Sequence, residues 1–297
     1  MKKAIFIALL ALASTASAAD VVCEGTRKLE IGDGVSNPTF SPDGSRMLFS
    51  TENFTGLKSL DIASGEVTVI DTSLAAGFNP VFSPDGGKVF FRRASFKDNL
   101  VYRDLVSYEF TTGKSKQLLK PTLERIVVAA DAKAVRVRSP KGFVAGTNGN
   151  NARFVASNFE TISVFDGMEQ KEIKPLADSY TYEWASLSPD GKRILFSEPF
   201  LGIYVCGIDG SDAVKIAQRG AYPQWVNDDI VTIVVTKDDG YGILASRIDA
   251  VEISSAKSTT LTPDDVVATE MSVCPATRQM AYSTLDGKMY ITNLVIR

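Results

Sequence analysis

Residues 37–51 read NPTFSPDGSRMLFST, and the recurrence of this pattern decides the fold. Two further clear copies are NPVFSPDGGKVFFRR, which begins at Asn79, and WASLSPDGKRILFSE, which begins at Trp184. In each copy the Ser-Pro-Asp-Gly tetrapeptide predicts a type I turn, because proline presets φ at the second position and glycine closes the turn. The apolar runs on either side predict two short strands. Each copy is therefore expected to form a β-hairpin.

Three weaker copies extend the repeat along the chain: VVAADAKAVRVRS from Val127, YPQWVNDDIVTIVV from Tyr222 and MSVCPATRQMAYST from Met271. Two more strand-like runs follow the hairpin in several units, as in residues 57–71. Four-stranded units of this kind can cover both faces only by stacking on neighbours, so the sequence predicts a six-bladed β-propeller with four-stranded blades. Successive copies are separated by 42, 46, 59, 38 and 48 residues, counted through Ser41, Ser83, Ala129, Ser188, Val226 and Cys274.

The two ends of the chain are expected to meet in the last blade. After Cys274 only two strand-like runs remain, and residues 27–31 form another before the first Ser-Pro-Asp-Gly copy. We therefore predict that this N-terminal strand completes the last blade and closes the ring. A single propeller domain would then span residues 19–297.

The long step between the third and fourth copies contains residues 140–159, whose Thr-Asn-Gly-Asn-Asn core predicts a turn-rich loop. Loops on a rigid scaffold often carry binding residues, so Asn148, Asn150 and Asn151 are candidates for a binding loop. The alternative is a longer hairpin that contacts no partner.

Residues 1–18 have the layout of a cleavable signal peptide. Lys2 and Lys3 precede an apolar run at 4–13, and small residues at 16–18 predict cleavage near Ala18. The protein is therefore expected in the periplasm or secreted. The apolar run is too short to be a permanent membrane span, so no stable membrane insertion is expected.

The composition excludes several classes of function. The 297 residues include no histidine, which removes Ser-His-Asp and Cys-His catalysis and every histidine-containing metal site. Without Lys2 and Lys3 the chain has 30 basic and 35 acidic residues, a net charge of −5 that predicts no nucleic-acid partner. No cofactor and no metal are expected.

Carboxylates are the remaining acid–base groups, and most of them have a structural explanation. The aspartates of the Ser-Pro-Asp-Gly copies are expected to cap their own turns, and the paired aspartates lack the alternating spacing of a calcium loop. The three cysteines are an odd number, so at least one thiol is free or paired with another chain; Cys206 and Cys274 are expected to be buried, and Cys23 is the one to watch. The aspartates concerned are Asp43, Asp85 and Asp190 in the turns and the pairs 228–229, 238–239 and 264–265.

The Ser-Pro-Asp-Gly repeat, preceded by Pro-x-Phe or Pro-x-Trp, resembles the WD-like repeat of the TolB β-propeller over residues 26–297. It is also similar to the propeller domain of prolyl-oligopeptidase-type enzymes. Residues 19–35 leave no room for the α/β domain of TolB, and the chain has neither the length nor the histidine for a hydrolase domain. The resemblance to TolB implies an interaction role in the bacterial envelope. Some pectate-degrading lyases have similar repeats, but that resemblance implies a histidine-containing metal site.

The innermost strands are expected to carry a ring of candidate binding residues at one mouth of the central channel. One core position per unit lies on one face of the inner strand, and the residue three places earlier lies on the opposite face. Blade symmetry would bring the second set together, to offer hydrogen bonds, one cation and stacking surfaces to a peptide or a glycan. The alternative is that this set only solvates the channel. The core set is Phe40, Phe82, Val128, Leu187, Trp225 and Val273, and the candidate ring is Asn37, Asn79, Arg125, Trp184, Tyr222 and Glu270.

The sequence thus predicts a non-enzymatic β-propeller that binds an envelope protein or peptide. The alternative is a carboxylate-based propeller that binds or cleaves a glycan, because propeller glycosidases use two opposed carboxylates.

Overall fold

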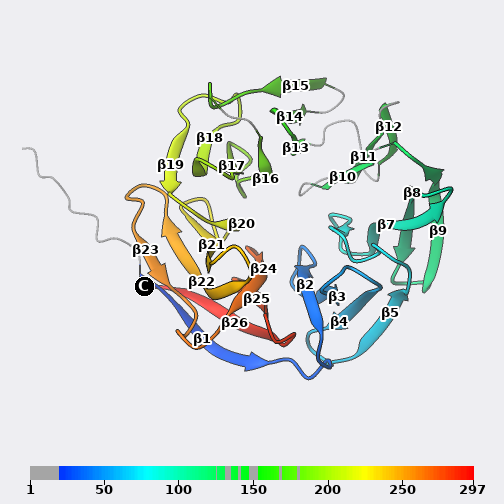
Figure 1. The fold of residues 1–297 in the computed structure, drawn as a ribbon, viewed down its shortest axis with the longest axis horizontal. Helices are drawn as coiled ribbons and strands as arrows, with labels where there is room; N and C mark the ends of the chain where they lie inside the picture. Colours follow the sequence, from blue (N-terminus) through cyan, green and yellow to red (C-terminus); the bar gives the residue numbers. More distant parts are fainter. Residues whose placement is uncertain are drawn as a thin grey trace, which may run out of the picture.

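The protein folds as a ring of antiparallel β-sheets (Figure 1). The computed structural model describes residues 20–124, 126–130, 135–139, 142–146, 153–166, 169–178 and 181–297, and these residues contain strands and no helix. The innermost strands of neighbouring sheets touch one another around much of the ring. The predicted all-β propeller is therefore confirmed.

Five of the sheets have four strands, with the first strand of each unit innermost. Strands β2 to β5 span Val35–Phe40, Arg46–Thr51, Leu57–Asp61 and Val67–Asp71, and β6 to β9 span Val81–Phe82, Lys88–Lys97, Leu100–Glu109 and Lys114–Thr122. Strands β16 to β19 span Glu183–Leu187, Arg193–Glu198, Gly202–Gly207 and Val214–Ala217. Strands β20 to β23 span Ala221–Trp225, Ile230–Asp238, Ile243–Glu252 and Ser258–Thr260. The fifth sheet joins β24 (Ala268–Cys274), β25 (Gln279–Thr284) and β26 (Met289–Ile296) to β1 (Val21–Lys28).

The third repeat unit differs from the other units. It forms two three-stranded sheets, so the described strands make seven sheets where the repeats predict six blades of four strands. The long step of the repeat holds two extra strands, and the predicted loop at 140–159 is largely strands β12 and β13. Asn148, Asn150 and Asn151 lie outside the described residues. One sheet has β10 (Val127–Ala130), β11 (Val135–Ser139) and β12 (Gly142–Gly146), and the other has β13 (Arg153–Asn158), β14 (Thr161–Asp166) and β15 (Glu169–Ile173).

The N-terminal strand closes the ring, as the sequence predicts. Strand β1 pairs antiparallel with β26, with Val21 opposite Ile296 and Cys23 opposite Leu294. The strand begins earlier than the predicted 27–31, and Leu29 continues the pairing through a backbone hydrogen bond from its N–H to the Met289 carbonyl at 2.8 Å. The first and last strands of the chain thus share one sheet.

The hydrophobic core lies in layers between adjacent sheets. One layer joins Leu29, Phe40 and Phe49 to Met289 and Ile291 of the closing sheet. Similar layers join the β16–β18 strands to the β13–β15 sheet and to the β20–β22 strands. Because every sheet depends on two neighbours for burial, the ring must be complete before the core is fully covered.

The Ser-Pro-Asp-Gly turns form as predicted. In the copy at 188–191, the N–H of Gly191 donates to the Ser188 carbonyl at 2.8 Å, which closes the turn, and Gly191 has a φ of 71°. The Ser188 hydroxyl donates to Asp190 Oδ1 at 2.6 Å and accepts the Arg193 N–H at 3.0 Å. The copies at Ser41 and Ser83 have the same serine–aspartate bond. These aspartates therefore stabilise turns.

The Ser188–Asp190 bond makes a testable contribution to acid stability. Hydrogen bonds from the Ser188 hydroxyl and the Lys192 N–H lower the pKa of Asp190 to about 2. Because this folded-state pKa lies below the ordinary value of about 4, ionised Asp190 stabilises the fold above about pH 4, and that contribution disappears as the pH falls toward about 2. In Ser188→Ala the pKa of Asp190 should rise toward about 4, so the variant should be less stable above about pH 4 and should lose less stability between about pH 4 and 2. An NMR titration of the Asp190 carboxyl carbon measures this. Ser64→Ala, which removes a bond to Asp61 instead, should leave the Asp190 titration unchanged.

All three cysteines lie in the described residues and are free thiols. Cys206 and Cys274 are buried, as predicted, and burial raises the pKa of Cys206 to about 12. Burial also raises the pKa of the half-buried Cys23. Within the described part of the chain there is no helix long and apolar enough to cross a membrane.

Candidate functional site

One face of the ring gathers the beginnings of the inner strands, and we call it the entry face. The loops between second and third strands return to this face because successive strands are antiparallel. Backbone hydrogen bonds tie these loops to the segments that lead into inner strands, as from Gly77 N–H to the Phe54 carbonyl and from Leu285 N–H to the Val267 carbonyl. The Ser-Pro-Asp-Gly turns lie on the opposite face, which we call the turn face.

Two adjoining hollows open at the entry face, and we call them together the mouth cavity. The larger has a volume of about 620 Å³ and the smaller about 380 Å³. Both are lined by Phe78, Asn79, Ser157, Phe159 and Trp184. Strand β13 also supplies residues to the wall of the mouth cavity, because it runs antiparallel to the neighbouring β16 and therefore ends at the entry face. There Phe159 forms an antiparallel β-bridge with Tyr182.

β-Bulges aim the predicted ring residues into this cavity. The pairing register of the inner strand shifts around Asn37, around Trp184 and around Tyr222. These residues have φ values of 58°, 50° and 50°, and Asn79 has 47°. A positive φ is rare for tryptophan or tyrosine, and bulges commonly redirect a side chain beside a functional site.

The structure brings four of the six predicted ring residues to one hollow. Asn37, Asn79, Trp184 and Tyr222 all line the smaller hollow. Asn37 is partly engaged, because its Nδ2 donates to Ser50 Oγ and to the Thr51 carbonyl, each at 3.2 Å.

The other two ring residues are not among the described residues that line this hollow. Glu270 lies near Tyr222. Arg125 lies outside the described residues.

The end of the cavity at Tyr222 is aromatic and acidic. The rings of Trp184 and Tyr222 lie 5.0 Å apart between centroids and are tilted by 39°. Burial, followed by the negative charges of Glu270 and Glu183, raises the pKa of Tyr222. Glu183 lines the smaller hollow, and no lysine or arginine is among the described residues that line it.

Hydroxyl groups hold Glu270 in place. Its Oε2 accepts hydrogen bonds from Ser36 at 2.7 Å, from Thr269 at 3.0 Å and from Ser283. The carboxylate is therefore fixed on the inner strand β24, near enough to Tyr222 for its negative charge to raise the pKa of the phenol.

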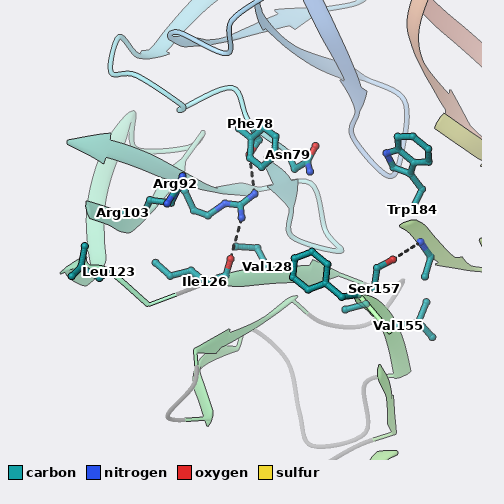
Figure 2. A pocket seen from close by; sticks show the side chains of 13 residues that line it. Phe78, Asn79, Arg92, Arg103, Leu123, Ile126, Val128, Val155, Ser157 and Trp184 are labelled. Atoms are coloured by element: carbon teal, nitrogen blue, oxygen red, sulfur yellow. Dashed lines mark hydrogen bonds between the residues drawn. The ribbon is translucent and has the colours of Figure 1, made fainter. Parts of the chain in front are cut away.

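The other end of the cavity is basic. Arg92 and Arg103 line the larger hollow, and the part of its lining that the structure describes includes no aspartate or glutamate. Figure 2 shows Arg92 between two chain segments, where its guanidinium donates to the Phe78 carbonyl at 3.1 Å and to the Ile126 carbonyl at 3.0 Å. The guanidinium also lies over the Phe78 ring, 5.1 Å from its centroid. In this view Trp184 stands on the far side of the hollow from Arg92.

Exposed apolar side chains gather on the entry face. Among the described residues, eleven of the fourteen exposed large hydrophobic residues lie there, and the other three are on the outer strands β5 and β19. Val67 and Val214 begin β5 and β19 beside the turn face, and no other described residue there is an exposed large hydrophobic, so apolar exposure is concentrated on the entry face. The eleven are Leu74, Phe78, Phe96, Leu100, Leu123, Phe159, Trp184, Phe200, Tyr241, Leu244 and Leu285.

Carboxylates accept backbone N–H bonds in some of the loops that carry these exposed side chains. Glu198 is fully buried and accepts the N–H groups of Phe200 and Leu201 at 2.8 and 2.7 Å. Asp239 Oδ1 accepts the N–H groups of Tyr241 and Gly242, both at 2.9 Å. The exposed rings of Phe200 and Tyr241 thus stand on ordered turns.

Sequence reasoning missed Phe78, Phe159, Arg92, Arg103 and Glu183. Phe78 and Glu183 directly precede predicted ring residues, so widening the ring by one position would have included them. The two arginines and Phe159 gave no comparable signal, because they reach the cavity from outside the inner-strand positions of the repeat.

The aspartate pairs lie between strands or, for Asp238, at the end of strand β21. Asp228 accepts the Asp190 N–H, and Asp239 caps the β21–β22 turn. Within the part of the chain that the structure describes, no group of three or more Cys, Asp or Glu side chains is placed to hold a metal ion.

A solved structure of oligogalacturonate lyase from Vibrio parahaemolyticus is similar to this chain. The TM-score is 0.51, the sequence identity is 12%, and the match covers 89% of this chain and 79% of the lyase. The shared feature is the fold. No protein-family profile matches the chain, and no curated protein matches it either. The resemblance of the Ser-Pro-Asp-Gly repeats to TolB therefore stays a prediction.

Proposed function

We propose that this protein is a non-enzymatic binding module that holds a segment of a partner protein at the mouth cavity. The observation that carries the proposal is the concentration of exposed apolar side chains on the entry face, around a cavity with aromatic and polar walls. Contiguous exposed apolar surface rimmed by polar groups is typical of interaction sites.

The arrangement of the face suits a protein partner. Aromatic and arginine side chains, here Trp184, Tyr222, Phe159 and Arg92, are the types that dominate binding energy in protein interfaces. Ordered tips such as Phe200 and Tyr241 need little further ordering on binding, which lowers its entropic cost. Export by residues 1–18 and the resemblance to TolB make a bacterial envelope protein the proposed partner.

Site-specific photocrosslinking tests the proposal. A photoreactive phenylalanine analogue is placed at Phe159, which is 64% exposed on the entry face, or at Val69, which is 56% exposed on the outer strand β5. In intact cells the first position should crosslink to a partner protein and the second should not. Trp184→Ala should weaken binding of that partner at least about tenfold, because buried interface tryptophans contribute strongly. Equal crosslinking from both positions would contradict the proposal.

A second candidate function is the binding or cleavage of an acidic glycan. The specific observation in its favour is the pair Arg92 and Arg103 in a cavity with aromatic walls, since arginine binds carboxylates well. Incubation of the mature protein with oligogalacturonate, followed by analysis of chain length, tests it. Catalytic shortening of the glycan would replace the non-enzymatic proposal.

A further inference from the structure

The mouth cavity has opposite charge at its two ends. Among the described residues that line the hollows, the larger has two arginines and no acidic residue, and the smaller has Glu183 and no basic residue. Their common wall is uncharged and includes Phe78, Asn79 and Phe159. A ligand that fills both hollows therefore meets a basic end, an apolar and amide middle, and an acidic end.

The basic end is built by strand register. In the β7–β8 pair, Arg92 lies opposite Leu105 and Arg103 lies opposite Ala94. The two arginines are therefore diagonal neighbours on one face of the hairpin, within reach of a single anionic group. None of the ion pairs between described residues includes Arg103. Two like charges on one cavity wall are stabilised by a bound anion.

The acidic end combines aromatic faces with carboxylates. The tilted rings of Trp184 and Tyr222 face the hollow, and Glu183 and Glu270 lie close to the phenol. An aromatic surface flanked by negative charge favours an ammonium or guanidinium group, through cation–π attraction and ion pairing. Glu270 is held by three hydroxyl groups, so this charge is fixed before a ligand arrives.

Resting on the function proposed above, we infer that the mouth cavity selects an extended polypeptide segment carrying both charges. An aspartate or glutamate of the segment binds at Arg92 and Arg103, and a lysine or arginine lies on Trp184 and Tyr222 beside Glu183 and Glu270. The charged groups are separated by residues that lie against Phe78 and Phe159. A polyanionic glycan satisfies the basic end only, and the carboxylates at the other end repel it.

Short synthetic peptides test this inference directly. Four acetylated and amidated peptides share one length and one central phenylalanine. The first carries an aspartate on one side of the phenylalanine and a lysine on the other. The second carries the aspartate alone, the third the lysine alone, and the fourth neither. Affinity is measured by calorimetry, and the fluorescence of Trp184 reports on binding at the mouth, because the other tryptophan, Trp225, is buried. The two-charge peptide should bind about tenfold more tightly than either single-charge peptide, and less so at high salt.

Charge reversals assign each preference to its end of the cavity. Arg103→Glu should remove the increase in affinity that the peptide's aspartate provides and keep the increase that its lysine provides. Glu183→Lys should remove the increase from the lysine and keep the increase from the aspartate. A general loss of structure would remove both gains together, so the split distinguishes recognition from folding. Lys215→Glu on the outer strand β19 and Glu66→Lys on the turn face are matched controls that should change neither gain.

The outcomes separate this inference from the function on which it rests. Equal affinity for all four peptides, or equal loss in the control variants, overturns the charge selection. If the photocrosslink at Phe159 still captures a partner protein, the binding function stands without it. If trigalacturonate binds more tightly than every peptide, and Arg103→Glu abolishes that binding, both the peptide inference and the protein-binding proposal are wrong.

Discussion

A chain without residues 20–31 is expected to lose most of its stability, because strand β1 supplies the outer strand of the closing sheet. The deletion removes the buried Val21 and Leu29, each contributing about 1.5–3 kcal/mol. It also removes the backbone hydrogen bonds to β26, each contributing about 1 kcal/mol net. The combined loss of about 5–10 kcal/mol equals the whole stability of a typical domain. Thermal unfolding followed by circular dichroism measures it.

Deletion of residues 295–297 is the control for this prediction. These residues include Val295 and Ile296, which pair with Val22 and Val21 at one end of β1. Their loss leaves Leu29 and the rest of the pairing in place, so the thermal midpoint should fall much less. The same midpoint for both truncations would show that β1 does not fasten the ring.

Gly202→Ala is expected to destabilise the protein by about 3–5 kcal/mol, because strain and steric overlap add. Gly202 has a φ of 124°, and a Cβ placed there would lie 2.3 Å from the Ala217 carbonyl oxygen. That oxygen belongs to the backbone of the adjacent strand β19, so the clash is relieved only by moving the strand.

Gly191→Ala is a matched control. Gly191 also has a positive φ, of 71°, but a Cβ there would have no atom within 4 Å. Its cost should be limited to the left-handed conformation, about 1–2 kcal/mol. Urea unfolding of both variants compares the two costs, and an equal loss of stability would show that the clash at Gly202 is absorbed by relaxation.

The sequence predicted the fold where local chemistry is strong. The Ser188–Asp190 turn forms the expected closing bond, and Phe40 and Trp225 are buried core positions. Closure by an N-terminal strand followed from counting strands after Cys274. The observed strand β1 begins at Val21, earlier than the predicted 27–31. The alternation of apolar and polar residues over Val21 to Glu24 is no stronger than over 27–31, so it did not indicate the earlier start.

The third unit could not be resolved from its sequence. Ala129-Ala130-Asp131-Ala132 stands where other units have Ser-Pro-Asp-Gly, so the turn that marks a hairpin is missing. The excess length of that step was compatible with a loop or with further strands. Short runs such as 142–146, with glycine at both ends, have little intrinsic strand preference.

The position of the candidate site was predicted, and its chemistry only in part. Blade symmetry was sufficient to bring Asn79, Trp184 and Tyr222 together. The bulges around Trp184 and Tyr222 have no local sequence signal, since tryptophan and tyrosine seldom adopt positive φ. The basic end needed the register of β7 and β8, which places Arg92 and Arg103 on one face of the hairpin.

The pairing of β1 with β26 also sets an order of events during folding. Val21 and Ile296 are neighbours in the sheet although they stand near opposite ends of the chain. During synthesis β1 is made first and its partner β26 last, and closing so long a loop is slow. Until β1 pairs with it, β26 is the unpaired outer edge of the last sheet. The protein therefore passes through an open ring, and that interval is when proteases and chaperones have access to its inter-sheet layers.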